Sequence, residues 1–309
     1  MIVREREDII GMGSAYVNKM QKALELMNIK LKNVLSQIHG SSGAKMIEAI
    51  INGERDSEKL LALCYSTVVT TKSEAIKKAL EGNYNPSWIF LLSANYKMWR
   101  QHNEHLHEID KKIESLLEEI MIDRPGITCT TKAKPIRHHK PEIRNLHQKM
   151  VNIYGTNVSS LSGITDYSAL RLLSETGFDL GRFPTAKHFI SWCQLSPRNS
   201  QSGTINRRLR MKAKSKAGQI FREAAQSLLQ SKKTAIGAFM RKIRSKKGAS
   251  IAIKAGARKI AMAYYNIITK GQEYVERGIN QYEAKIRERE IRLLSKLAIK
   301  YNVSLLNSQ

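Results

Sequence analysis

The sequence predicts a mostly α-helical protein in which a heptad coiled-coil region precedes a compact helical domain. Two runs of apolar residues at spacings of three and four predict helices that pair through one face. A basic segment containing proline separates these runs from later helical patterns, so it predicts a boundary between two parts of the chain.

The first run has the a/d spacing of a coiled-coil helix, and a segment rich in glycine and serine ends it at 39–43. Its members are Ile10, Val17, Met20, Leu24, Met27, Leu31, Val34 and Ile38.

The second heptad run has charged residues between its apolar positions, and we expect it to pair antiparallel with the first, within one chain or across a dimer. Its members are Leu106, Ile109, Ile113, Leu116 and Ile120. Between the two runs the pattern predicts short helices at 46–51, 58–63 and 73–80. A homo-oligomer held through the coiled coil is therefore expected.

The predicted organisation has four parts. Residues 1–122 form the helical coiled-coil region, 123–141 a basic linker, 142–275 the compact domain and 276–309 a charged C-terminal helix.

The charge of the chain predicts a polyanionic partner. The sequence has 52 Lys and Arg against 27 Asp and Glu, a formal charge of +25. Between Gly181 and Lys259 there are 20 Lys or Arg and the single acid Glu223. A surface with such an excess normally binds nucleic acid, so we expect the second domain to be the DNA-binding half.

Several classes of protein are not indicated. No stretch approaches the roughly 20 apolar residues of a membrane helix, and the N-terminus has no apolar leader segment. The isolated Cys64, Cys129 and Cys193 form no CxxC pair, so neither a disulfide framework nor a cysteine zinc site is predicted. We expect a soluble cytoplasmic protein with no membrane partner.

The segment 161–165 resembles the hairpin of a helix-hairpin-helix module. In such a hairpin, main-chain N–H groups at a helix N-terminus bind a phosphate, here from Gly163, Ile164 and Thr165. The alternative is an ordinary helix start with Thr165 or Asp166 as the N-cap.

A loop at 195–204 places serines just before a basic run, after a segment in which Phe183, Phe189, Ile190 and Trp192 are expected in the core. From the residues alone Ser202 and Ser200 are equal candidates for a nucleophile toward a phosphodiester, and simple loop serines are the competing interpretation. The cations expected to hold the DNA backbone are Arg207, Arg208, Arg210, Lys212, Lys214 and Lys216, with a further clamp at Arg241, Lys242 and Arg244.

No metal site is predicted in this chain. There is no P-loop and no HExxH motif, and His102, His105 and His107 cannot all share one helix face. A two-metal nuclease needs converging carboxylates. In the second domain Glu175 and Asp179 are expected on one face of a helix and Asp166 precedes them, which is too little for such a site.

The order of motifs in the second half resembles the C-terminal domain of transposases of insertion-sequence family 110. The matching residues are Gly163-Ile164, Glu175 to Asp179, Phe183 to Thr185, Lys187 to Phe189, Ser191-Trp192, Leu195 to Pro197, Asn199, Ser202-Gly203, Ala224 to Leu228 and Ala255 to Ala261. Upstream, Val17 to Leu31 and Gly53 to Asp56 resemble the helical middle region of the same family. Thr204-Ile205 and Ser162 depart from the family pattern.

The resemblance implies an enzyme of DNA transposition or site-specific recombination. It implies Ser202 as the nucleophile, double-stranded DNA and a structured bridge RNA as partners, and an oligomeric assembly in a prokaryotic, nucleoid-associated setting. Mg²⁺ would be held by four acids of an N-terminal RuvC-like domain, which we expect to lie upstream of Met1. The alternatives are a non-catalytic nucleic-acid-binding or oligomerisation fragment, and a DNA invertase of the same family.

Overall fold

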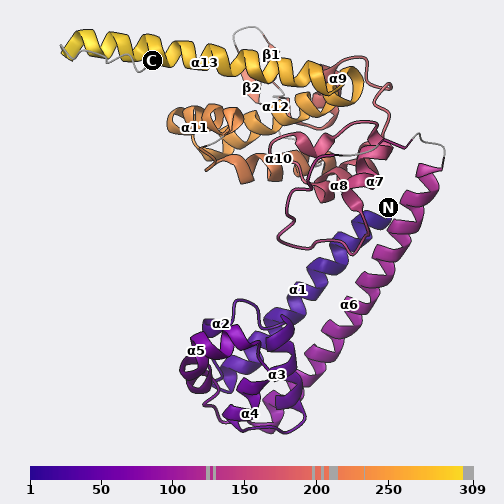
Figure 1. The fold of residues 1–309 in the computed structure, drawn as a ribbon, viewed down its shortest axis with the longest axis vertical. Coiled ribbons are helices and arrows are strands. Elements are labelled where there is room, and N and C mark those ends of the chain that lie inside the picture. The colour runs from indigo at the N-terminus through magenta and orange to yellow at the C-terminus, as the bar shows by residue number, and fades with distance from the viewer. Residues whose placement is uncertain are drawn as a thin grey trace. The chain divides into compact units, whose positions relative to one another are not determined.

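The computed structural model describes residues 1–122, 126–127, 130–196, 199–202, 205–208, 215–232 and 234–301. These residues are mostly helical, as the sequence predicts (Figure 1). The chain divides into two compact units, Met1–Glu114 and Ser115–Gln309. Helix α6 (Pro86–Met121) contributes to both of them.

In the first unit, α1 (Ile2–Leu26) and α6 lie side by side and run antiparallel (Figure 1). Arg6 bonds to Asp110, and ten residues later along α1 the Tyr16 ring lies 5.1 Å from the His102 ring. Val3 and Ile9 are buried on the same face of α1 as the predicted heptad positions. Knobs-into-holes packing of the two helices stays a prediction.

The rest of the first unit is a cluster of short helices around an apolar core. They are α2 (Leu31–Val34), α3 (Ser41–Ile51), α4 (Ser57–Ala62) and α5 (Ser66–Ala79). Met20 and Met27 pack there with Met46, Ile47 and Ile50, and all five are fully buried.

Two details of the heptad prediction are wrong. The first run is not one helix, because α1 ends at Leu26 and Asn28 takes a left-handed conformation with φ 62°. In the second run Ile120 is 37% exposed, whereas Leu117 is 3% exposed. A straight helix drifts away from a strict seven-residue repeat, so the buried stripe moves round the helix. The helix predicted at 73–80 also begins earlier, at Ser66.

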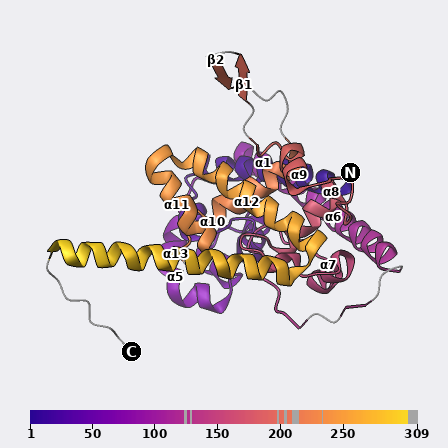
Figure 2. The ribbon, with the colours of Figure 1, turned by 90° about the horizontal axis from the view of Figure 1, so that it is seen from above.

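The second unit is built from further helices and one short 3₁₀ turn. Its elements are α7 (Leu146–Tyr154), η1 (Val158–Ser160), α8 (Asp166–Thr176), α9 (Ala186–Trp192), α10 (Lys216–Leu228), α11 (Ala235–Lys247), α12 (Ala249–Lys270) and α13 (Gln272–Tyr301). Helix α12 packs against α9, α10 and α11 (Figure 2). None of the described helices has both the length and the apolar composition that a membrane span requires.

An aromatic cluster forms the core of the second unit. Phe189 is fully buried, with the rings of Phe183 at 5.2 Å, Tyr264 at 5.9 Å and Phe221 at 6.1 Å. Trp192, which the sequence places in the core, is instead 42% exposed, since it lies at the last turn of α9 and covers the edge of the cluster.

Two short strands replace the loop that the sequence predicts at 195–204. β1 (Asn199–Ser202) and β2 (Ile205–Arg208) pair antiparallel, with Asn199 opposite Arg208 and Ser202 opposite Ile205 (Figure 2). The Asn-Ser-Gln-Ser segment lacks the β-branched and aromatic residues of typical strands. Pairing between neighbouring segments, and not side-chain propensity, therefore forms this hairpin.

Candidate nucleic-acid interface and polar network

The main chain of the β-hairpin positions the serine candidates. Ser202 is the last residue of β1, and Ser200 is paired with Arg207 of β2. The side chains of 199–202 and 205–208 lie outside the described residues, so the structure leaves the choice between the two serines open. The fold nevertheless places both of them on a hairpin that carries two of the predicted phosphate-binding arginines, Arg207 and Arg208.

The remaining basic run continues into α10. Arg210, Lys212 and Lys214 lie outside the described residues. Lys216 is the exposed first residue of α10, whose N-cap Ser215 accepts a bond from Gly218 N. The start of this helix therefore presents a cation beside the positive end of the helix dipole, a combination that favours an anion.

The turn before α8 is built for close packing. Gly163 has φ +81°, and a Cβ there would lie 2.8 Å from the Ala224 carbonyl oxygen. Ile164 is fully buried, and Thr165 is the N-cap, accepting a bond from Ser168 N at 3.2 Å. Phosphate contact through the main chain of Gly163, Ile164 and Thr165 stays a prediction, because the first two residues pack inward.

The second basic cluster lies on α11, and its members differ in solvent exposure and in hydrogen bonding. The Arg241 guanidinium donates to the Ser231 carbonyl oxygen and is half-buried. Lys242 and Arg244 are exposed, as are Lys246 and Lys247 further along the helix. The Arg241 side chain therefore helps to hold the structure together. The exposed Lys242 and Arg244 side chains are accessible to an anion in solution.

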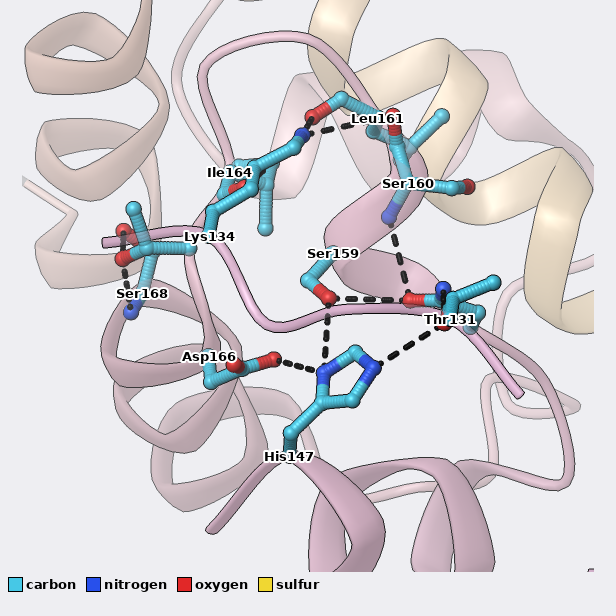
Figure 3. Close-up of polar contacts among 11 residues, drawn as sticks. Thr131, Lys134, His147, Ser159, Ser160, Leu161, Ile164, Asp166 and Ser168 are labelled. Carbon is cyan, nitrogen blue, oxygen red and sulfur yellow. Dashed lines mark hydrogen bonds and ion pairs between the residues drawn. The ribbon is translucent and has the colours of Figure 1, made fainter. Parts of the chain in front are cut away.

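A partly buried polar network that the sequence does not predict joins the segment 130–134 to α7, η1 and α8 (Figure 3). His147 Nδ1 lies 2.8 Å from Asp166 Oδ1, and His147 Nε2 lies 3.0 Å from Thr131 Oγ1. The side chains of His147 and Asp166 are 13% and 3% exposed. Asn157 completes the network, because its Nδ2 donates to Thr131 Oγ1 at 2.8 Å.

Lys134 anchors the same segment to the turn before α8 (Figure 3). Its Nζ donates to the carbonyl oxygens of Leu161 at 2.7 Å and of Ser160 and Ile164 at 3.3 Å each. Burial lowers the pKa of the Lys134 ammonium, and the nearby Asp166 carboxylate opposes that shift. Thr131 and Lys134, which lie in the predicted basic linker 123–141, are thus hydrogen-bonded to α7, η1 and the turn before α8.

The acids of the second unit do not converge. Glu175 and Asp179 do not share a helix, contrary to the prediction, because α8 ends at Thr176 and Gly177 follows with φ +71°. Asp179 Oδ1 accepts a bond from Gly181 N, and Asp166 is committed to His147. Across the residues that the structure describes, no group of three or more His, Cys, Asp or Glu side chains could hold a metal ion.

Comparison with known families finds a match within the second unit. Residues 155–241 match the sequence model of the transposase IS116/IS110/IS902 family. This part of the chain is similar to a transposase domain of that family. The matched range contains α8 to the first half of α11, together with the β-hairpin and both serines. No curated protein matches the chain.

The transposase domain assigns the protein to DNA transposition or recombination in general terms. The basic residues Arg207, Arg208, Lys216 and Arg241 all fall inside the matched range, while Lys242 and Arg244 lie just after it. The sequence signals for this domain were its motif order and its excess of cations. The Thr131, His147 and Asp166 network carried no such signal, because its members are distant in the chain and only the fold brings them together.

Proposed function

We propose that the protein is a DNA transposase or recombinase in which Ser202 is the nucleophile for strand cleavage and exchange. The observation that supports this most is the family match over 155–241, which includes the Ser202-Gly203 pair. In the proposed step Ser202 Oγ bonds to a DNA phosphorus, the bond from phosphorus to the leaving sugar oxygen breaks, and the proton lost by the serine hydroxyl is balanced by the one that the leaving oxygen takes up. Attack by the freed hydroxyl of another strand on the serine ester would then complete the exchange.

We propose that double-stranded DNA binds through its phosphates. Arg207, Arg208, Arg210, Lys212, Lys214 and Lys216 would neutralise the backbone near Ser202, and Lys242 and Arg244 would extend the contact from α11. The exposed side chains of Lys216, Lys242 and Arg244, in a stretch of sequence with a single acid, support this proposal, because neutralised phosphates release counterions.

A bridge RNA and a homo-oligomer assembled through α1 and α6 belong to the same proposal, as does a location in the cytoplasm.

The described acids do not fit a metal site. Mg²⁺ would therefore have to be bound by a RuvC-like domain of the family and not by the described part of this chain. The lack of fit between the described acids and a metal site also favours the second candidate function, a non-catalytic nucleic-acid-binding module. An invertase of the same family would share every residue named.

The test is a covalent-adduct assay on a denaturing gel. The full chain, with Mg²⁺, would be incubated with labelled DNA carrying the ends of its element and with the RNA that flanks it. Ser202→Ala should abolish the adduct that peptide mapping locates on the segment 199–207 and leave DNA binding unchanged, while Ser200→Ala should retain that adduct. An adduct that survives Ser202→Ala but not Ser200→Ala would transfer the role to Ser200. Binding with no adduct in any variant would support the non-catalytic module.

A further inference from the structure

The hydrogen bonds around Thr131 allow its hydroxyl to donate a proton to His147. Asn157 Oδ1 accepts from the main-chain N–H of Ser160 at 3.1 Å, which identifies the other amide atom as the nitrogen. That nitrogen donates to Thr131 Oγ1. With His147 in the tautomer that carries its N–H at Nδ1, toward Asp166 Oδ1, the Thr131 hydroxyl can donate its proton to His147 Nε2.

A carboxylate, an imidazole and a hydroxyl bonded in this order form the arrangement that activates a hydroxyl as a nucleophile. The imidazole takes the hydroxyl proton, and the carboxylate holds the ring in the required tautomer. Asp166 and His147 are shielded from solvent, whereas Thr131 is exposed. Thr131 is therefore the solvent-facing member of the three, while the base and its partner are enclosed.

The surroundings of Thr131 indicate an anionic substrate. Between Thr130 and Pro141 the sequence has no acid, and Lys132, Arg137 and Lys140 are exposed there. The Asn157 amide at 2.8 Å would stabilise negative charge developing on Thr131 Oγ1. Cations of this kind hold phosphate oxygens.

We propose that Thr131 is a second nucleophile of the protein, acting on a phosphodiester of nucleic acid, with His147 as its general base and Asp166 as the residue that orients His147. The choice of nucleic acid as substrate rests on the proposed function. In the step, Thr131 Oγ1 bonds to phosphorus and its proton passes to His147 Nε2. The bond from phosphorus to the leaving sugar oxygen breaks, and His147 returns the proton to that oxygen.

Activation of Thr131 can be tested without DNA by using a fluorophosphonate as the probe. Its phosphorus would bond to Thr131 Oγ1, fluoride would leave, and mass spectrometry of peptides would locate the label. We expect labelling of Thr131 in the folded full chain, and a rate about a hundredfold lower in His147→Gln. Thr131→Ser should keep the label, since it keeps a hydroxyl at the same position.

Thr130, the exposed neighbour, provides the matched control. Thr130→Val should leave the labelling rate unchanged and Thr131→Val should remove it. Absence of label on Thr131 in the folded protein, or equal labelling of Thr130 and Thr131, would overturn the proposal. The network would then only fasten the segment 130–134 to α7 and α8.

A parallel DNA-binding measurement separates this inference from the proposed function. Labelling of Thr131 without any DNA binding would support activation and contradict nucleic acid as its substrate. DNA binding without labelling would contradict only the Thr131 proposal. A DNA adduct that Thr131→Val removes, and that persists in Ser202→Ala, would support Thr131 as a second nucleophile on DNA.

Discussion

At the scale of single residues, the most consequential interaction of the first unit is the ion pair of Arg6 and Asp110. Their side chains are 1% and 2% exposed, and Arg6 donates through both Nε and Nη2. Removing one member of such a pair leaves the other charge buried. Arg6→Met should therefore lower the free energy of unfolding by about 3–5 kcal/mol.

The control for this prediction is the exposed pair of Arg100 and Glu48, in which the side chains are 53% and 48% exposed. Arg100→Met should cost about 1 kcal/mol or less. Urea unfolding followed by the fluorescence of Trp88 and Trp99 reports on the first unit. The double variant Arg6→Met with Asp110→Leu should recover much of the loss. A small effect of Arg6→Met alone would show that the pair is not buried in solution.

The buried tyrosine pair of the second unit predicts a dependence of stability on alkaline pH. The hydroxyls of Tyr154 and Tyr264 lie 2.9 Å apart, and Thr176 Oγ1 lies 3.1 Å from Tyr264. Burial raises the pKa of Tyr264 to about 12. The folded state thus favours the protonated phenol, and its contribution to stability is complete below about pH 10 and is lost as the pH rises toward about 12.

Unfolding of wild type and Tyr264→Phe at pH 9 and pH 11, followed through Trp192, tests this dependence. The variant should be less stable by about 1 kcal/mol at pH 9, and it should lose less stability than wild type on going to pH 11. Tyr65→Phe, at an exposed position, should behave as wild type. Identical pH dependence in wild type and Tyr264→Phe would contradict the assignment.

At the scale of elements, two glycines in helices should respond oppositely to alanine. Gly218 lies in the first turn of α10, and a Cβ there would overlap the Cys193 carbonyl oxygen. Gly11 lies in the middle of α1, and a Cβ there would meet nothing within 4 Å. We expect Gly218→Ala to lower the free energy of unfolding by about 1–3 kcal/mol and Gly11→Ala to raise it by about 0.5–1 kcal/mol. Urea unfolding of each variant measures both, and a stabilised Gly218→Ala protein would show that α10 and α9 are not so close.

The elements also show what sequence patterns can and cannot predict. Capping residues and periodicity predicted much of the helical content, including the helix stop at Asn52-Gly53 and the start of α8 after Thr165. The predicted single helix through Ile38 was wrong, because helical spacing alone does not reveal the left-handed Asn28. The β-hairpin was missed since its strands have no strand-like composition, although two residues including a glycine join them.

The same contrast holds for the candidate site. Charge and motif order were sufficient to predict the match to a transposase domain, because both depend only on which residues occur and in what order. The polar network at Thr131 depends on residues that lie 16 and 35 positions further along the sequence, at His147 and Asp166. Contacts between such distant residues are set by tertiary packing, so no local pattern could predict them.

At the scale of the whole molecule, the proposed function requires that cations of the protein bind the phosphate backbone of DNA. The net charge of +25 must then act through particular exposed cations. Lys242 and Arg244 are such residues on α11, and Lys111 and Lys112 on α6 are exposed lysines outside the transposase domain.

The measurement that tests this claim most directly is the salt dependence of duplex DNA binding by the full chain. If about six phosphates are neutralised, the logarithm of affinity should fall against the logarithm of salt concentration with a slope of roughly −5. Replacing Lys242 and Arg244 by Gln should reduce the slope by about 2, while replacing Lys111 and Lys112 by Gln should leave it unchanged. A flat response in the wild-type protein would contradict the claim, and it would mean that the basic surface faces a partner other than DNA.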